Sequence, residues 1–144
     1  MRDDFGFPGM KILQFAFDSG PDNPYLPENY SSNSVVYTGT HDNDTTLGWW
    51  RGLTTGQKDR VQDYLGTPLP DIPWELIQLA MSSAADLCVI PCQDILSLDK
   101  ESRFNTPGQA MGNWGWQITS GQLTDALADR LLKLTEKYHR LIVQ

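Results

Sequence analysis

The sequence has no cluster of lysine and arginine residues, and its formal net charge at pH 7 is -7. A chain with this charge repels the phosphates of nucleic acids and of anionic lipids. It has no apolar run near the roughly 18 residues that a membrane-spanning helix needs, and it does not begin like a signal peptide. We therefore expect a protein that binds neither nucleic acid nor membrane and that works in the cytoplasm or, in a plant, in the plastid stroma.

Residues that bind metal ions through sulfur or imidazole are scarce. The sequence contains two cysteines, Cys88 and Cys92, and two histidines, His41 and His139. If residues 88–92 form a strand, the two cysteine Cα atoms lie about 13 Å apart, which is too far for a disulfide. A zinc site needs more ligands at suitable spacing than these residues provide. We expect two buried thiols, no metal and no cofactor.

The 144 residues match the usual size of a single domain, and they contain no internal repeat and no low-complexity tract. Apolar and β-branched runs predict strands at 10–17, 34–38 and 87–90, the first of them buried on both faces. Apolar spacing predicts helices at 54–64, 71–84 and 124–141, capped by Thr54 or Thr55, Asp71 and Thr124, with Gly66 ending the first. A short turn is predicted at 95–98. The remaining segments 18–33 and 101–116 are predicted loops. Strands that alternate with helices favour an α/β fold with a parallel sheet.

Polar residues follow each predicted strand at its carboxyl end. They are Asp18 and Asp22 after the first strand, His41 to Asp44 after the second, and Gln93, Asp94, Arg103, Asn105 and Asn113 after the third. In parallel α/β folds the ligand lies beyond the carboxyl ends of the strands. Carboxylates and amides pair with vicinal hydroxyls, so we predict a site for a sugar or polyol. The alternative is a surface loop in which these side chains only cap the next helix.

Three longer motifs carry a resemblance to a known family. They are F-G-F-P-G-M-K-I-L-Q-F-A-F at 5–17, Y-T-G-T-H-D-N-D-T-T-L-G-W-W at 37–50, and R-F-N-T-P-G followed by N-W-G-W at 103–116. In this order they resemble 4-α-glucanotransferase, the amylomaltase or disproportionating-enzyme family. The resemblance implies that 1–144 is one domain, the C-terminal part of an α/β (β/α)₈ TIM barrel with about three parallel strands. It also implies a parent enzyme that transfers α-1,4-glucan segments between malto-oligosaccharides by a retaining mechanism.

The same resemblance implies roles for individual residues. The family uses an Asp nucleophile, a Glu acid/base and a second Asp that stabilises the transition state. Only the last of these has a matching position here, Asp42. His41 and Asn105 are the implied ligands of sugar hydroxyls, and Phe15 is the implied stacking residue. We expect Asp42 to be a buried carboxylate that accepts hydrogen bonds from two neighbouring hydroxyls, which suits an oxocarbenium-like transition state on physical grounds.

Several other residues invite a role that we do not give them. Asp3 and Asp4 precede the first strand, so we do not assign them the missing acid functions. The tryptophans at positions 49, 50, 114 and 116 are interpreted as packing residues rather than as sugar platforms. A phosphohydrolase would also show the pair His41–Asp42, but it needs further metal ligands on helices, and His139 is the only other histidine.

A non-catalytic glucan-binding or self-assembling piece is the stronger alternative, because the nucleophile and the acid/base are missing. Three strands cannot close a barrel, so the outer strands keep unpaired edges that recruit other chains. We therefore expect the isolated chain to be inactive as a transferase and to associate with itself.

Overall fold

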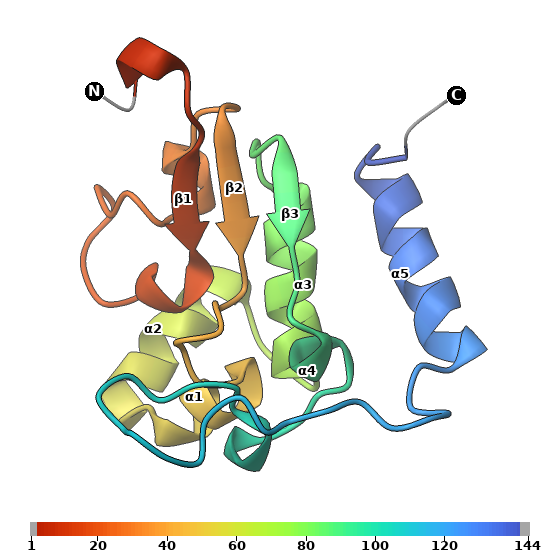
Figure 1. Ribbon diagram of the computed structural model, residues 1–144. Coiled ribbons are helices and arrows are strands. Elements are labelled where there is room, and N and C mark those ends of the chain that lie inside the picture. The colour runs from red at the N-terminus through yellow and green to blue at the C-terminus, as the bar shows by residue number, and fades with distance from the viewer. Residues whose placement is uncertain (1–2, 142–144) are drawn as a thin grey trace.

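The computed structural model describes residues 3–141 and contains one sheet of three parallel strands (Figure 1). The strands are β1 (Gly9–Ile12), β2 (Ser34–Tyr37) and β3 (Leu87–Val89), and they lie in the order β1-β2-β3. Lys11 pairs with Val36 and Val36 with Cys88, so β2 is the central strand and Val36 is fully buried. The predicted α/β fold with a parallel sheet is confirmed.

The first strand is shorter than predicted. β1 ends at Ile12, which pairs with the last residue of β2, Tyr37, and Leu13–Phe15 turn into a 3₁₀ helix. Beyond Ile12 the neighbouring strand offers no further partner, so the chain turns and buries Leu13 in the core instead. The expectation that this strand is buried on both faces is also wrong, because Met10 is 58% exposed. One face of the sheet is therefore open.

The helices pack behind the sheet, near its carboxyl end and to its side (Figure 1). They are α1 (Thr46–Gly52), α2 (Thr55–Leu65), α3 (Ile72–Ser82), α4 (Cys92–Ile95) and α5 (Asp125–Lys137), with short 3₁₀ helices at Asp3–Phe5, Leu13–Phe15, Pro27–Asn29 and Lys100–Ser102. Leu76 and Ala80 of α3 pack against Leu13 and Val36 and form the main core. The other side of α3 forms a second cluster that faces α5 (Figure 1).

Capping residues explain where α2 begins and ends. Thr54 and Gln57 form a capping box, and Gly66, with φ 83°, ends the helix as predicted. The structure adds one helix that was not predicted, α1, which Thr45 caps by accepting a hydrogen bond from the Gly48 N–H. It also adds α4 directly after Pro91, and the turn expected at 95–98 follows this helix.

The last helix begins at the predicted cap, Thr124, but its apolar stripe is not core. Leu127, Leu131, Leu134 and Tyr138 are only partly buried against α3, and Leu141 is 48% exposed. The reason is that α5 packs on one helix and stands to the side of the sheet (Figure 1). Polar contacts reinforce the attachment: the Arg130 guanidinium lies 3.9 Å from the Trp74 ring centre and donates to Asp71 at 2.8 Å.

The two cysteines were expected to be buried. Cys88 and Cys92 are free thiols, but both are only half-buried. Burial nevertheless raises the pKa of the Cys88 thiol to about 11.

Trp49 and Trp50 pack against the main core, as predicted. Within residues 3–141, no helix has both the length and the apolar character needed to cross a membrane.

Candidate active site

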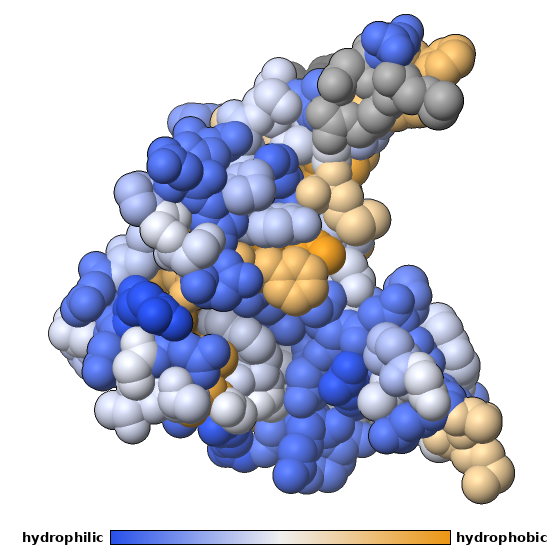
Figure 2. Space-filling view, turned by 90° about the vertical axis from the view of Figure 1, so that its left-hand side faces the viewer, coloured by the Kyte–Doolittle hydropathy of each residue, from blue (hydrophilic) through white to orange (hydrophobic). Residues whose placement is uncertain are grey.

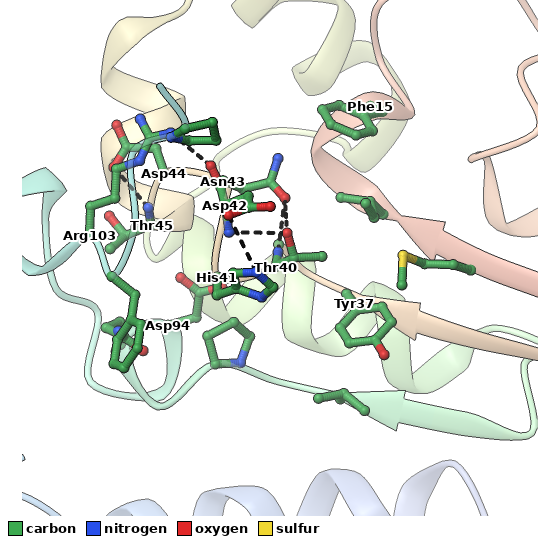
Figure 3. Close-up of a pocket in the computed structure, with 18 residues that line it drawn as sticks. Phe15, Tyr37, Thr40, His41, Asp42, Asn43, Asp44, Thr45, Asp94 and Arg103 are labelled. Atoms are coloured by element: carbon green, nitrogen blue, oxygen red, sulfur yellow. Dashed lines mark hydrogen bonds and ion pairs between the residues drawn. The ribbon is translucent and has the colours of Figure 1, made fainter. Parts of the chain in front are cut away.

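A cleft of about 810 Å³ lies on the open face of the sheet and extends past the carboxyl ends of the strands (Figure 3). Strand residues form its apolar floor, and the loop between β2 and α1 forms its polar wall. Its lining includes Met10, Ile12, Phe15, Tyr37, Val89, Phe104 and the whole of 39–45. We call residues 39–45 the acidic loop, because they carry Asp42 and Asp44.

The two ends of the acidic loop are fixed by one buried carboxylate. Asp94 of α4 is 1% exposed, and its Oδ2 accepts hydrogen bonds from the hydroxyls of Thr38 at 2.5 Å and Thr46 at 2.7 Å. Its Oδ1 accepts from the Thr46 N–H at 2.8 Å. Burial raises the pKa of Asp94, although the three donors oppose that shift. Thr38 directly precedes the acidic loop and Thr46 directly follows it, so the loop starts and ends at fixed points.

The middle of the acidic loop is ordered by its own side chains and by Gln14. The Asn43 Oδ1 accepts from the Thr40 N–H at 2.9 Å and from the Thr40 hydroxyl at 2.7 Å. Gln14 donates to the carbonyl oxygen of Asp44 at 2.9 Å. The loop therefore has little freedom to move its tip.

At two glycines around this loop, neighbouring side chains occupy the space that a Cβ atom would take. A Cβ at Gly39 would lie 2.6 Å from the Gln14 Nε2, and one at Gly48 would lie 2.6 Å from the Asp44 Oδ1. A side chain at either position would displace a group that holds the loop.

The tip of the acidic loop holds His41 and Asp42 in the cleft lining (Figure 3), and Asn105, which lies outside that lining, contacts Asp42. The Asn105 side-chain amide donates to the Asp42 Oδ1 at 2.5 Å, and the His41 Nε2 lies 3.3 Å from the same oxygen. The Asp42 side chain is 50% exposed and that of His41 57%. We expected a buried carboxylate at Asp42, and this is wrong: the site is open to solvent on the side away from Asn105.

Residues 103–116, called the rim segment, hold the tip from outside. Arg103 donates to the carbonyl oxygens of Asp42 at 2.7 Å and Asn105 at 2.9 Å. The Asn105 N–H donates to the carbonyl oxygen of His41 at 3.1 Å. Backbone and side-chain contacts thus join two segments that are about sixty residues apart in the sequence.

Trp114 of the rim segment was interpreted as a packing residue, and its ring packs at the surface rather than in the core. It is 58% exposed, its ring centre lies 5.3 Å from that of His41, and its φ of 61° is left-handed. The Trp114 N–H donates to the Phe104 carbonyl at 2.7 Å, and the two rings meet edge to face. Trp114 therefore presents an aromatic surface beside the tip of the acidic loop.

Other predicted site residues lie elsewhere. Phe15 lies on the cleft wall at 38% exposure, next to Tyr25. Asp18 does not line the cleft; it accepts a hydrogen bond at 2.9 Å from the buried Asn23, which orders the 18–33 loop. Asp22 and Asn113 are also outside the cleft lining, and Asn113 instead supports the turn at Thr106.

Sequence reasoning missed Gln14 and the special place of Asp94. Gln14 is the one uncharged polar residue inside the apolar run 10–17, and this interruption was the available signal. Asp94 was noted only as one polar residue after a strand. Among the described residues, no group of three or more His, Cys, Asp or Glu side chains is placed to hold a metal ion.

The geometry can be compared with known proteins. The sequence model of the 4-alpha-glucanotransferase family matches residues 1–124. The chain belongs to the 4-alpha-glucanotransferase family. A 4-alpha-glucanotransferase of Synechocystis is 53% identical over 144 residues, which cover 99% of this chain and 28% of that protein. That of Thermus thermophilus is 48% identical, with 98% and 30% covered. A chloroplastic/amyloplastic 4-alpha-glucanotransferase of Arabidopsis thaliana is 49% identical, with 98% and 25% covered.

Solved structures support the fold. Amylomaltase from Streptococcus agalactiae in complex with acarbose matches with a TM-score of 0.91 and 32% identity, over 96% of this chain and 28% of that one. Amylomaltase from Corynebacterium glutamicum matches with a TM-score of 0.62 at 17% identity, which supports the fold alone. The expected fold, part of an α/β TIM barrel, is confirmed. The chain spans less than a third of the length of the relatives it matches.

Proposed function

We propose that this chain forms part of a 4-α-glucanotransferase that moves α-1,4-glucan segments between malto-oligosaccharides with retention of configuration. Membership of the family supports the reaction class. The observation that carries the proposal is the tip of the acidic loop, where Asp42, His41 and Asn105 meet at the carboxyl end of a parallel sheet. The structural neighbour from Streptococcus agalactiae holds acarbose, a ligand of the expected sugar class.

In this proposal Asp42 binds two neighbouring sugar hydroxyls and stabilises the cationic transition state. Asn105 and His41 both contact the Asp42 Oδ1, and half of the side chain stays exposed to the cleft. Hydrogen bonds from sugar hydroxyls to a carboxylate strengthen as positive charge develops on the sugar ring. Phe15 on the cleft wall offers an aromatic face to a ring.

The reaction also needs a nucleophile and an acid/base, whose carboxyl groups lie about 5 Å apart in retaining enzymes. We propose that other parts of the enzyme supply both, and that the domain 1–144 is the C-terminal part of its barrel. The isolated chain would then lack transferase activity. The proposed partners are malto-oligosaccharides and α-1,4-glucans. The net charge of -7 disfavours binding to nucleic acid and membrane. The proposed compartment is the cytoplasm or the plastid stroma.

A replacement experiment tests the assignment of Asp42. This chain replaces the matching segment of the Synechocystis relative, and disproportionation of maltotriose is measured. Asp42→Asn should lower the rate by at least about 1000-fold, because the charge that faces the cationic transition state is lost. Asp63→Asn, an exposed change on α2, is the matched control and should leave the rate unaltered. Near-normal turnover by the Asp42→Asn enzyme would contradict the proposal.

A second candidate function is a non-catalytic, self-associating glucan binder. It is favoured by the open sheet face, where Met10 is 58%, Leu87 60% and Val89 44% exposed, and by the unpaired outer edges of β1 and β3. Figure 2, which views the β1 side, shows apolar residues at the surface among hydrophilic ones. Light scattering and a glucose-release assay on the isolated chain separate the cases. A monodisperse monomer would contradict self-association, and measurable transfer would contradict the need for further acids.

A further inference from the structure

A single side chain, that of Asp94, accepts hydrogen bonds from the residues at both ends of the acidic loop. We propose that Asp94 is a positioning residue that sets the place of the Asp42 carboxylate by holding Thr38 and Thr46. This inference rests on the proposed function of Asp42. Asp94 borders the cleft, but we do not assign it a catalytic role, because it is 1% exposed and both of its carboxylate oxygens already accept hydrogen bonds from Thr38 and Thr46.

The hydrogen bonds support this role by their arrangement. Thr38 and Thr46 donate their hydroxyls to the same oxygen, the Asp94 Oδ2, at 2.5 Å and 2.7 Å. The residues just before and just after the acidic loop are therefore both bonded to the same atom, the Asp94 Oδ2. The Thr46 N–H adds a third bond, to Oδ1, and so fixes the first turn of α1.

Asp94 is in turn fixed to the sheet. It lies in α4, which starts directly after Pro91 and follows β3. The Asp94 N–H donates to the carbonyl of Pro91 at 3.0 Å, and the Asp94 carbonyl accepts from the Ser97 N–H at 3.0 Å. The Asp94 carboxylate thus links the segment that follows β3 to both ends of the loop that follows β2.

A carboxylate suits this place better than an apolar side chain would. Thr38 and Thr46 are both fully buried, so without Asp94 two hydroxyls and one N–H would lose their acceptor away from water. A buried donor without a partner costs about 1–3 kcal/mol in general. Gln14 and Arg103 would still hold the carbonyls of Asp44 and Asp42. Loss of Asp94 should therefore let the loop open more often and shift its tip, while these two contacts keep it from detaching completely.

Amide hydrogen exchange followed by NMR tests the proposal on the 144-residue chain. The reporters are the N–H groups of Thr40 and Asn43, which bond within the acidic loop and not to Asp94. Asp94→Ala should speed their exchange at least about 10-fold, because the loop opens more often once its ends are released. Asp94→Asn keeps a carbonyl acceptor and an amide that can face the hydroxyls, so it should restore slow exchange.

Ser34→Ala is the matched control. Ser34 is 1% exposed at the opposite end of β2, and its hydroxyl donates to the Ser31 carbonyl at 2.6 Å. It should leave exchange at Thr40 and Asn43 unchanged. If Asp94→Ala does not fold, Thr38→Val and Thr46→Val each remove one of the two hydroxyls, and each should speed exchange by a smaller factor. Unchanged exchange in the folded variants would overturn the proposal.

The replacement enzyme described above provides a kinetic test. Thr38→Val should lower kcat for maltotriose about 10-fold with less than a twofold change in KM, since the displaced Asp42 acts mainly on the transition state. Equal changes in kcat and KM, or none, would contradict a positioning role. The two proposals fail separately: an active Asp42→Asn enzyme removes the proposed function, while unaltered loop exchange removes the role of Asp94 only.

Discussion

Residues 9–94 and residues 95–141 differ in how they are held. Every buried residue in the described part of the chain lies between Gly9 and Asp94, and none from 95 to 141 is buried. The first region contains the sheet, the core around α3 and the acidic loop. The second region contains the rim segment, which Arg103 attaches through hydrogen bonds, and α5, which partly buried apolar side chains and Arg130 attach to α3. Full apolar burial thus stabilises the first region, whereas partial burial and polar contacts hold the second.

The difference suggests that stability and site geometry can be changed separately. The Asp42 carboxylate belongs to the first region, but its closest protein donor, Asn105, belongs to the second. A change in the second region should therefore disturb the site while the core stays folded. The following predictions test this separation, beginning with the largest effect.

Removing a core side chain should show the largest effect on stability. Leu76 of α3 is fully buried, so Leu76→Ala should lower the free energy of unfolding by about 2–5 kcal/mol. Leu132 of α5 is 47% exposed, and Leu132→Ala should change the free energy of unfolding by less than about 0.5 kcal/mol. Urea denaturation followed by circular dichroism measures both. Similar losses from the two changes would mean that the regions are not held differently.

Asn105→Ala should separate the site from the fold. It removes the donor to the Asp42 Oδ1, and in the replacement enzyme kcat/KM for maltotriose should fall about 10-fold. The urea midpoint should stay the same, because Asn105 is not part of the core. Gln122→Ala, at an exposed turn before α5, is the control and should change neither quantity. A lowered midpoint for Asn105→Ala would place the rim segment in the folding unit.

Arg103→Lys should have a smaller effect of the same kind. The guanidinium donates to two carbonyls at once, whereas a lysine ammonium on its flexible stem does not reproduce this fork. We expect kcat/KM to fall about threefold, since one of two hydrogen bonds is lost. Arg60→Lys, an exposed change on α2, controls for the charge-preserving substitution. A loss as large as that of Asn105→Ala would indicate that Arg103 acts on Asp42 more directly.

The smallest effect concerns the contact between the two regions at Arg51 and Asp99. The N–H of Lys100, and then the Arg51 guanidinium, hold the pKa of the Asp99 carboxyl below its usual value. A lowered folded-state pKa stabilises the protein above the unfolded-state pKa of about 3.9, and this contribution disappears as the pH falls through the folded-state value. The stability difference between wild type and Asp99→Asn should therefore be present at pH 7 and shrink on acidification. A difference that grows towards pH 3 would contradict it.

Local patterns predicted much of the fold. A threonine cap at Thr54 or Thr55 and a stop at Gly66 were predicted for α2 and agree with the structure, and Thr124 marked the start of α5. The order of three parallel strands followed from apolar runs between helical patterns. The meeting of His41, Asp42 and Asn105 at one sheet edge followed from the resemblance to the family and from the carboxyl-end rule.

What the sequence did not predict depends on partners that are distant in the chain. The end of β1 is set by the length of β2, and the partial burial of α5 is set by the single helix it packs on. Asp18 was expected at the site because it follows a strand, yet Asn23 holds it outside. Trp114 reaches the site through a left-handed backbone conformation that periodicity does not encode.

The crowding at Gly39 and Gly48 limits how the acidic loop can be redesigned. At each position an added methyl group would meet an atom of Gln14 or Asp44 at 2.6 Å. In a mutant library aimed at new acceptor sugars, a change at either glycine would therefore have to move the Gln14 amide or the Asp44 carboxylate. Diversity introduced at the exposed Met111 or Leu123, by contrast, would be retained through selection for folding, because both side chains face solvent.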